Sequence, residues 1–214
     1  MTTFVLSDAD EVRSAEIAGT DAPDAVVQAA AGLYRTRTLH EVTLEDVAAA
    51  AGVAPAEVRG RFAAIDELLL AVVEVWNAQR MRPLVPIAGS HGAVALLRAI
   101  VIANVQDPAL MRLLTGMANI AATPGHRLAP VLQQQWVQFH ALVQRTLAHD
   151  VAVGREPETM EPSRGAEQLI AMYEGLQLQS MLRPNMDVLE SYDRAVTRLR
   201  EGWSHSYTPP VWEL

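Results

Sequence analysis

Four arginines lie close together in the first third of the sequence, and their guanidinium groups have the chemistry to bind phosphate or guanine. Arg35 and Arg37 precede the stretch TLEDVAAAAGVAPAEVRGRF, which begins at Thr43. Arg59 and Arg61 lie near its end. A guanidinium donates parallel hydrogen bonds to phosphate oxygens or to O6 and N7 of guanine. The amides at the start of a helix after Thr43 would add a further phosphate contact.

Acidic residues in the same part of the chain oppose this chemistry. Residues 1–76 contain five arginines and thirteen acidic residues, a net charge of −8 that equals the net charge of the whole chain. Six of these acids lie in residues 1–24 and could point away from DNA. Glu57 could accept a hydrogen bond from cytosine or repel phosphate. The charge pattern alone leaves DNA binding open.

The residues around the arginines have the spacing of short helices. Residues 23–35 carry an apolar stripe, with Asp21 as a suitable cap. Thr43 and Asp46 have the spacing of a capping box at the start of a second helix. Gly52 lies where a helix end commonly needs a left-handed residue. These signals predict two helices followed by a tight turn.

A third short helix is expected to begin after Ala54 and to end at Phe62, which would anchor it in the core. Three helices with this turn form a helix-turn-helix unit, whose last helix lies in the major groove of DNA. Besides the four arginines, Thr43, Ala54 and Glu57 are therefore candidates for DNA contact.

The rest of the chain is also predicted to be helical. Residues 66–80 form a connecting helix, and the segment RMRPLVPIAGSHG then breaks the pattern near 81–91 with two prolines and two glycines. Further helices are expected at 92–106, 108–122, 126–150, 164–183 and 187–203. The sequence thus predicts an all-α fold of about nine helices.

Residues 29–73 resemble the DNA-binding part of the tetracycline-repressor (TetR) family of bacterial regulators. The matching stretches are AAAGLY at 29–34, VTLEDVAAAAGVAPAEV at 42–58, Phe62 and DELLLAVV at 66–73. YEGLQLQSML at 173–182 is placed like the family's penultimate helix. The resemblance implies a dimeric transcriptional regulator whose first three helices bind DNA and whose later helices hold a small-molecule pocket.

This resemblance divides the chain into four predicted parts. They are a flexible acidic arm at 1–20, a helix-turn-helix DNA-binding domain at 21–65, the connecting helix at 66–80, and an effector-binding and dimerisation domain at 81–214.

The sequence departs from the family's pattern in the reading helix and just after it. Where the family usually has a Gly-Thr pair, an aromatic pair, a His and a Lys, this chain has Ala56-Glu57, Arg59-Gly60, Arg61 and Ile65. Two guanidinium groups are gained, one Lys is lost, and an acid enters the helix.

Nine residues on the expected regulatory helices are candidates for the ligand pocket. Each alone is a typical core residue, but together they offer apolar walls with a few polar groups, as ligand sites do. They are Trp76, Asn104, Met111, Met117, Asn119, Trp136, Phe139, His140 and Tyr173. Asn104 and Asn119 interrupt apolar helices, and a buried amide needs partners in the chain or on a ligand.

An apolar stripe near the C-terminus is the candidate dimer interface. Its residues are Leu169, Leu176, Leu182, Leu189, Tyr192, Val196, Leu199 and Trp203. Such a stripe is either internal core or a subunit interface, and the family resemblance favours two-fold pairing of residues 164–203.

Composition and motifs predict a cytoplasmic binding protein rather than an enzyme. The chain has no cysteine, which excludes disulfides and thiolate chemistry. Its six histidines lack metal-ligand spacing, and no nucleophilic triad, phosphate-binding loop or carboxylate pair is evident. No metal or cofactor is therefore expected. The acidic N-terminus is unlike a signal peptide, and no uncharged apolar stretch reaches about 18 residues, so no membrane span is expected.

Taken together, these features predict a homodimeric repressor that binds operator DNA and releases it when a small apolar effector binds. The alternative is a dimeric ligand-binding or protein-binding module whose head no longer binds DNA.

Overall fold

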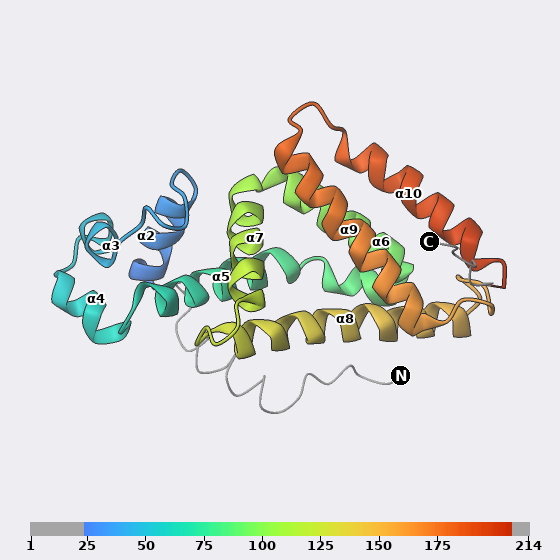
Figure 1. The fold of residues 1–214 in the computed structure, drawn as a ribbon, viewed down its shortest axis with the longest axis horizontal. Coiled ribbons are helices and arrows are strands. Elements are labelled where there is room, and N and C mark those ends of the chain that lie inside the picture. Colours follow the sequence, from blue (N-terminus) through green and yellow to red (C-terminus); the bar gives the residue numbers. More distant parts are fainter. Residues whose placement is uncertain (1–23, 207–214) are drawn as a thin grey trace, which may run out of the picture.

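Residues 24–206 form nine α-helices and no β-strand in the structure, a computed structural model that describes this part of the chain (Figure 1). The helices are α2 (Ala25–Tyr34), α3 (Leu44–Ala51), α4 (Pro55–Arg61), α5 (Ile65–Met81), α6 (Val85–Gln106), α7 (Pro108–Ala122), α8 (Ala129–Ala152), α9 (Pro162–Leu182) and α10 (Val188–Trp203). The all-α prediction is confirmed. The predicted arm at 1–20 and the predicted cap at Asp21 lie outside the described residues.

Helices α2, α3 and α4 form a small head at one end of the molecule (Figure 1). Asp24 caps α2 by accepting a hydrogen bond from the main-chain nitrogen of Val26 (2.9 Å). Thr43 and Asp46 form the predicted capping box on α3. Gly52 ends that helix with a φ of 69°, which favours glycine. Local sequence signals therefore define the helix-turn-helix unit.

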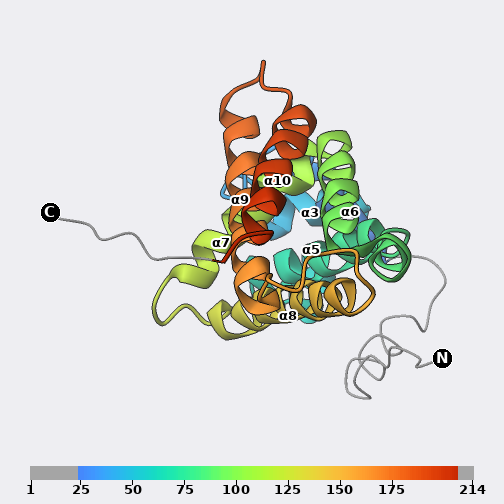
Figure 2. The same cartoon turned by 90° about the vertical axis from the view of Figure 1, so that its right-hand side faces the viewer.

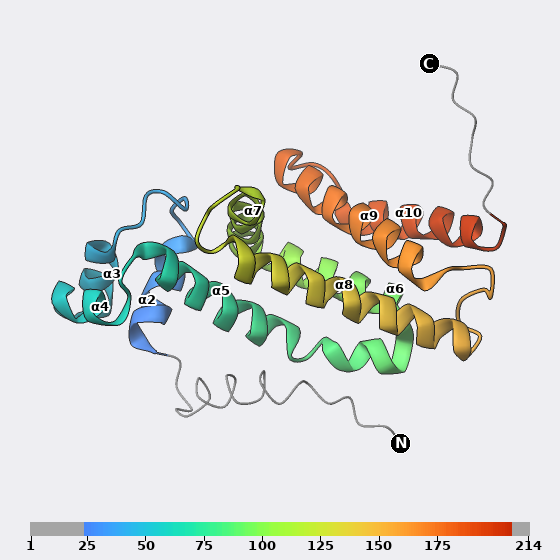
Figure 3. The ribbon, with the colours of Figure 1, turned by 60° about the horizontal axis from the view of Figure 1, so that its bottom comes forward.

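The core of the head continues into α5 and α7. Val47 and Val58 of the head share one buried cluster with Val72 of α5 and with Leu110 and Met117 of α7. Figures 1 and 3 show α7 between the head and the long helices α8 and α9. Because protein cores are close-packed, a shift of α7 moves residues that support the head.

A second core lies at the other end of the molecule, among α6, α8, α9 and α10 (Figure 2). Leu97, Val143, Leu169 and Tyr192 are fully buried in it. By length and composition, α6 is the one helix in residues 24–206 that could cross a membrane. Its residues Leu96, Leu97, Ile100 and Val101 are buried in this cluster.

The break predicted at 81–91 is mostly helical in the structure. Helix α6 begins at Val85 rather than at residue 92, and the chain bends at Gly92, whose φ is 89°. The buried carboxylate of Asp150 accepts a hydrogen bond from the main-chain nitrogen of Ala93 (2.8 Å). It also pairs with Arg155. Asp150 therefore caps the second part of α6 from a distant helix.

We expect Gly92→Ala to destabilise the fold by at least about 2 kcal/mol, because left-handed backbone is strained with a side chain. A Cβ there would also lie 2.5 Å from Oδ2 of Asp150. The matched control is Gly89→Ala, in the same helix with no atom within 4 Å of the added Cβ. The control should be neutral or stabilising by up to about 1 kcal/mol. Urea denaturation of both variants tests this, and equal stabilities would contradict the assigned role of Gly92.

Candidate functional site

Arg59 and Arg61, the two arginines of α4, are each paired with a carboxylate of the head. Arg59 pairs with Glu45 on α3, and Arg61 pairs with Asp24, the cap of α2. The two arginine side chains remain 54% and 43% exposed. Exposed ion pairs contribute roughly 0–1 kcal/mol, so a phosphate can replace either carboxylate at little cost. The carboxylates nevertheless compete with DNA for these arginines.

The outer surface of α4 is exposed and of mixed charge. Val58 is the buried residue that fastens this helix to the head. Ala54 lies at the N-cap position and provides no side-chain hydrogen bond. Glu57 is exposed in the first turn, one turn before Arg61. The surface therefore presents guanidinium and carboxylate groups side by side.

Arg37 and Thr43 both bind Asp46. The hydroxyl of Thr43 donates to Asp46 Oδ2 (2.9 Å) and accepts from the Asp46 main-chain nitrogen (3.1 Å). Nη1 of Arg37 lies 3.2 Å from Asp46 Oδ2. The hydrogen bonds from Thr43, and then the guanidinium of Arg37, hold the pKa of the Asp46 carboxyl below its usual range. A phosphate near Thr43 would meet this carboxylate, which opposes the predicted contact.

Arg35 lies at the other end of α2 from Asp24, at the contact between the head and α7. Its Nη1 is 3.5 Å from Oδ1 of Asp107, and its guanidinium carbon is 4.5 Å from the ring centroid of Trp76. Asp107 also accepts from Nε1 of Trp76 (2.6 Å) and caps α7. Arg112 of α7 donates to the main-chain oxygen of Arg35 (3.0 Å). We call these four residues the Asp107 junction.

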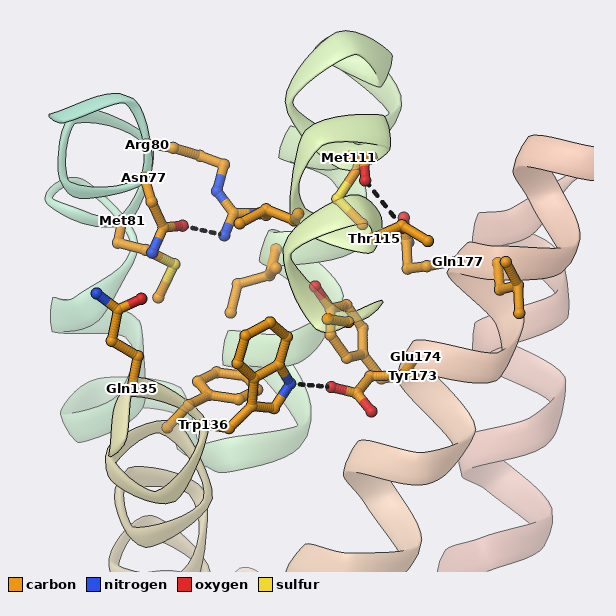
Figure 4. Close-up of a pocket in the computed structure, with 15 residues that line it drawn as sticks. Asn77, Arg80, Met81, Met111, Thr115, Gln135, Trp136, Tyr173, Glu174 and Gln177 are labelled. Carbon is orange, nitrogen blue, oxygen red and sulfur yellow. Dashed lines mark hydrogen bonds between the residues drawn. The ribbon is translucent and has the colours of Figure 1, made fainter. Parts of the chain in front are cut away.

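A cavity of about 310 Å³ lies among α5, α6, α7, α8 and α9 (Figure 4). Its lining residues are Asn77, Arg80, Met81, Ile100, Met111, Leu114, Thr115, Ala118, Gln135, Trp136, Phe139, Tyr173, Glu174, Gln177 and Leu178. Apolar walls with a few convergent polar groups are typical of small-molecule sites, and this volume is near the lower end of their range.

The polar end of the cavity is built around Arg80. Its guanidinium donates to Oδ1 of Asn77 (2.6 Å) and to Oδ1 of Asn104. Nδ2 of Asn104 in turn donates to the hydroxyl of Tyr173 (2.9 Å). Burial raises the pKa of the Tyr173 hydroxyl, while the charge of Arg80 opposes that shift. The buried Asn104 amide thus has its partners within the chain.

A second polar contact of the lining joins Trp136 and Glu174, apart from Arg80 in Figure 4. Nε1 of Trp136 donates a hydrogen bond to Oε1 of Glu174 (3.1 Å). Glu174 is exposed, so this bond lies toward the solvent side of the cavity. Trp136 and Glu174 therefore hold α8 and α9 together beside the cavity.

The structure brings together four of the nine predicted ligand residues. Met111, Trp136, Phe139 and Tyr173 line the cavity. Asn104 lies behind it, bonded to two lining residues. The other four do not line it: Trp76 and Met117 are buried in the first cluster, Asn119 is exposed, and His140 is partly buried elsewhere on α8. Their helical positions point them away from the cavity.

Six polar residues of the lining were not predicted from the sequence, namely Asn77, Arg80, Thr115, Gln135, Glu174 and Gln177. One signal for Gln177 is its position one turn after Tyr173, on the buried side of α9. Among residues 24–206, no group of three or more His, Asp or Glu residues is arranged to hold a metal ion.

Half of the residues in the predicted dimer stripe are buried within the chain itself. Leu169, Tyr192, Val196 and Trp203 are buried by the chain's own packing. Leu176, Leu189 and Leu199 are partly buried, and Leu182 is 74% exposed. Helical periodicity identified buried positions but not which chain buries them.

The family of the chain follows from its C-terminal helices. Residues 92–201, more than half of the chain, match the C-terminal domain of BetI-type transcriptional repressors, one of the C-terminal domain types of TetR regulators. The chain belongs to the TetR family of transcriptional regulators. It is therefore a regulator rather than an enzyme. No curated protein matches the sequence.

Solved structures of TetR-family regulators have the same fold. A TetR regulator from Haloarcula marismortui aligns with a TM-score of 0.72 and 14% identity over 83% of this chain and 95% of that one. FadR of Thermus thermophilus, in complex with lauroyl-CoA, aligns with a TM-score of 0.62 and 19% sequence identity. The alignment covers 88% of this chain and 98% of FadR. SmeT of Stenotrophomonas maltophilia, in complex with triclosan, aligns with a TM-score of 0.64 and 21% sequence identity. The alignment covers 88% of this chain and 98% of SmeT.

We expect Asp107→Ala to cost about 2–4 kcal/mol of stability, because it removes a helix cap and leaves the buried indole N–H of Trp76 without its acceptor. The matched control is Asp187→Ala, since Asp187 caps α10 by accepting from the Glu190 main-chain nitrogen (2.9 Å). The control should cost about 1 kcal/mol. Urea denaturation measures both, and equal losses would show that the junction adds nothing to the cap.

Proposed function

We propose that this TetR-family regulator is a cytoplasmic homodimeric repressor that binds operator DNA through its head and releases it when a small, largely apolar effector enters the cavity. The observation that carries the proposal is the position of α7. Asp107, the N-cap of this helix, binds Arg35 of the head, and the helix lines the cavity one turn later at Met111. In the ligand complexes of FadR and SmeT, proteins of the same fold hold lauroyl-CoA and triclosan.

The proposed mechanism is thermodynamic linkage through α7. If the effector and the operator favour different positions of α7, each weakens the binding of the other by the same factor. The Asp107 junction gives the coupling a physical route, because it contacts α2, α5 and α7 at one carboxylate. Titration of the effector against the operator complex tests the repressor mechanism.

The second candidate function, a ligand-binding or protein-binding module with a head that does not bind DNA, is favoured by the ion pairs of the head. Arg37, Arg59 and Arg61 each lie against a head carboxylate. Selection of bound sequences from random DNA at several salt concentrations separates the two functions. Enrichment of one motif supports the repressor, and no enrichment even at low salt supports the module.

We expect Glu45→Gln to tighten operator binding, because it removes the carboxylate that competes for Arg59. Arg59→Ala should weaken binding by roughly 1–3 kcal/mol if this side chain reads a base. The control is Glu161→Gln, which breaks an exposed pair with Arg164 at the start of α9. Neither residue lines the cavity or the groove between α9 and α10, so affinity should be unchanged. Fluorescence anisotropy with the selected operator measures all three variants. Unchanged affinity in both head variants would refute the assignment of α4 as the reading helix.

The proposed dimer uses the outer surface of α9 and α10. A groove there is lined by Leu176 and Leu189, and Leu182 lies near it at the end of α9. The rest of the groove is lined mainly by charged and polar side chains of the two helices. Pairing two copies would cover the leucines and present two heads to successive major grooves, roughly 34–36 Å apart.

We expect the double variant Leu182→Glu with Leu189→Glu to be a folded monomer that has lost about tenfold or more of its operator affinity, because two linked heads bind more tightly than one. Light scattering after size-exclusion chromatography measures the mass. The control is Val137→Glu, at a residue of α8 that is 59% exposed, which should leave the dimer intact. A monomeric wild-type protein at micromolar concentration would overturn the dimer.

A further inference from the structure

Arg80 is a cation in the cavity wall without an anionic partner. Its guanidinium contacts two neutral amides, those of Asn77 and Asn104. Within residues 24–206, no carboxylate lies within ion-pair distance of it. The other arginines of this region without a carboxylate partner are exposed to solvent, namely Arg82, Arg112, Arg145 and Arg183. Arg80 differs from these four because it is partly buried. Burial of a charge costs free energy unless a counter-charge is near.

Two hydrogen-bond donors on the cavity wall lack acceptors. Nε of Arg80 and Nε2 of Gln177 are buried atoms without a partner, and Gln177 is only 4% exposed. Both side chains line the cavity, from α5 and α9 (Figure 4). Buried donors in folded proteins are nearly always satisfied, so such a pair in a cavity indicates a ligand acceptor. The third such atom in the described residues, the hydroxyl of Tyr34, lies in the core of the head.

The remaining wall is suited to an apolar body. Ile100, Met111 and Leu114 contribute aliphatic and thioether surface, and Phe139 and Tyr173 contribute two aromatic rings whose centroids are 6.3 Å apart. The volume of about 310 Å³ limits the ligand to a compact molecule. Glu174, the carboxylate of the lining, is exposed and bonded to Trp136, so a second negative charge on the ligand would be repelled there.

We propose that the cavity binds a compact monocarboxylate with an apolar body, whose carboxylate accepts hydrogen bonds from Arg80, with Gln177 as a further donor to the ligand. A carboxylate matches the planar donor geometry of a guanidinium and supplies the missing charge. The monocarboxylate would be the effector of the proposed repressor. Its binding to the cavity does not depend on that function, but its effect on operator binding does.

The same contact gives the ligand a route to the Asp107 junction. A carboxylate bound at Nε of Arg80 would share this guanidinium with Asn104, whose Oδ1 accepts from Nη1. Asn104 lies in the last turn of α6, and its main-chain oxygen accepts from the Asp107 nitrogen (3.1 Å). Occupation of the cavity therefore alters the contacts of the turn that positions Asp107.

The test compares ligands of one body and different charge on the full chain. Decanoate and 1-naphthylacetate serve as probes. Each is compared with the alcohol and with the ammonium compound that carry the same hydrocarbon group. Isothermal titration calorimetry without DNA gives the affinities. We expect the carboxylates to bind at least about tenfold more tightly than the alcohols, as a charge-assisted hydrogen bond implies. Equal affinities, preference for the ammonium compounds, or no binding of either carboxylate would overturn the proposal.

Variants then assign the preference to Arg80. Arg80→Met keeps a long side chain without charge and should remove the preference for carboxylates while alcohol binding persists. Gln177→Leu should weaken carboxylate binding by a smaller factor. The control Arg82→Met changes an exposed arginine one residue beyond α5 and should have no effect. An intact preference in a folded Arg80→Met protein would overturn the assignment, and the wild-type comparison decides the ligand class even if this variant does not fold.

The outcomes also separate this inference from the proposed function. A carboxylate preference in a protein that selects no operator supports the ligand class and contradicts the repressor. If the alcohols release the protein from its operator as well as the carboxylates do, the proposed repressor function stands and the proposed carboxylate preference is wrong.

Discussion

The Asp107 carboxylate joins the head, α5 and the start of α7 through one group. It binds Arg35 at the end of α2 and Trp76 in α5, and it caps α7. Because these bonds converge on one group, the three helices cannot change their relative positions without losing some of them. The first core packs around the same contact, so the head is tied to the wall of the cavity rather than linked by a flexible segment.

The carboxylates that pair with the arginines of the head change the balance of forces that would act on DNA. Most regulators gain nonspecific affinity because basic side chains release counterions from DNA. Here the arginines of α4 already have carboxylates as counter-charges, and binding exchanges one anionic partner for another. The gain from phosphate is therefore reduced, and a larger share of the affinity has to come from contacts with base edges. A head of this kind favours discrimination between sequences over general attraction to DNA.

Features that depend on neighbouring residues could be predicted from the sequence, whereas features that depend on distant residues could not. The capping box at Thr43 and the left-handed Gly52 depend on neighbouring residues alone, and both were predicted. Pro86 was interpreted as part of a break, but it lies in the first turn of α6, where proline is tolerated. The bend at Gly92 depends on Asp150, which is distant in sequence. Periodicity likewise showed that Tyr192 is buried but could not show that α6 covers it.

The candidate site was harder to predict because its polar residues stand out only by their missing partners. Arg80 has no carboxylate nearby, and Nε of Arg80 and Nε2 of Gln177 have no hydrogen-bond acceptor. Arg80 and Gln177 resemble ordinary surface residues in the sequence, and only the packing of α5 against α6 and of α8 against α9 encloses them. The chain thus uses arginine in two environments. In the head, water screens each guanidinium, so partners are exchanged cheaply and binding depends on salt. In the cavity, Arg80 is partly buried among neutral polar groups beside an apolar wall, so water screens its charge less than it screens the arginines of the head. The proposed effector site is therefore the one where the charge of a ligand is screened least.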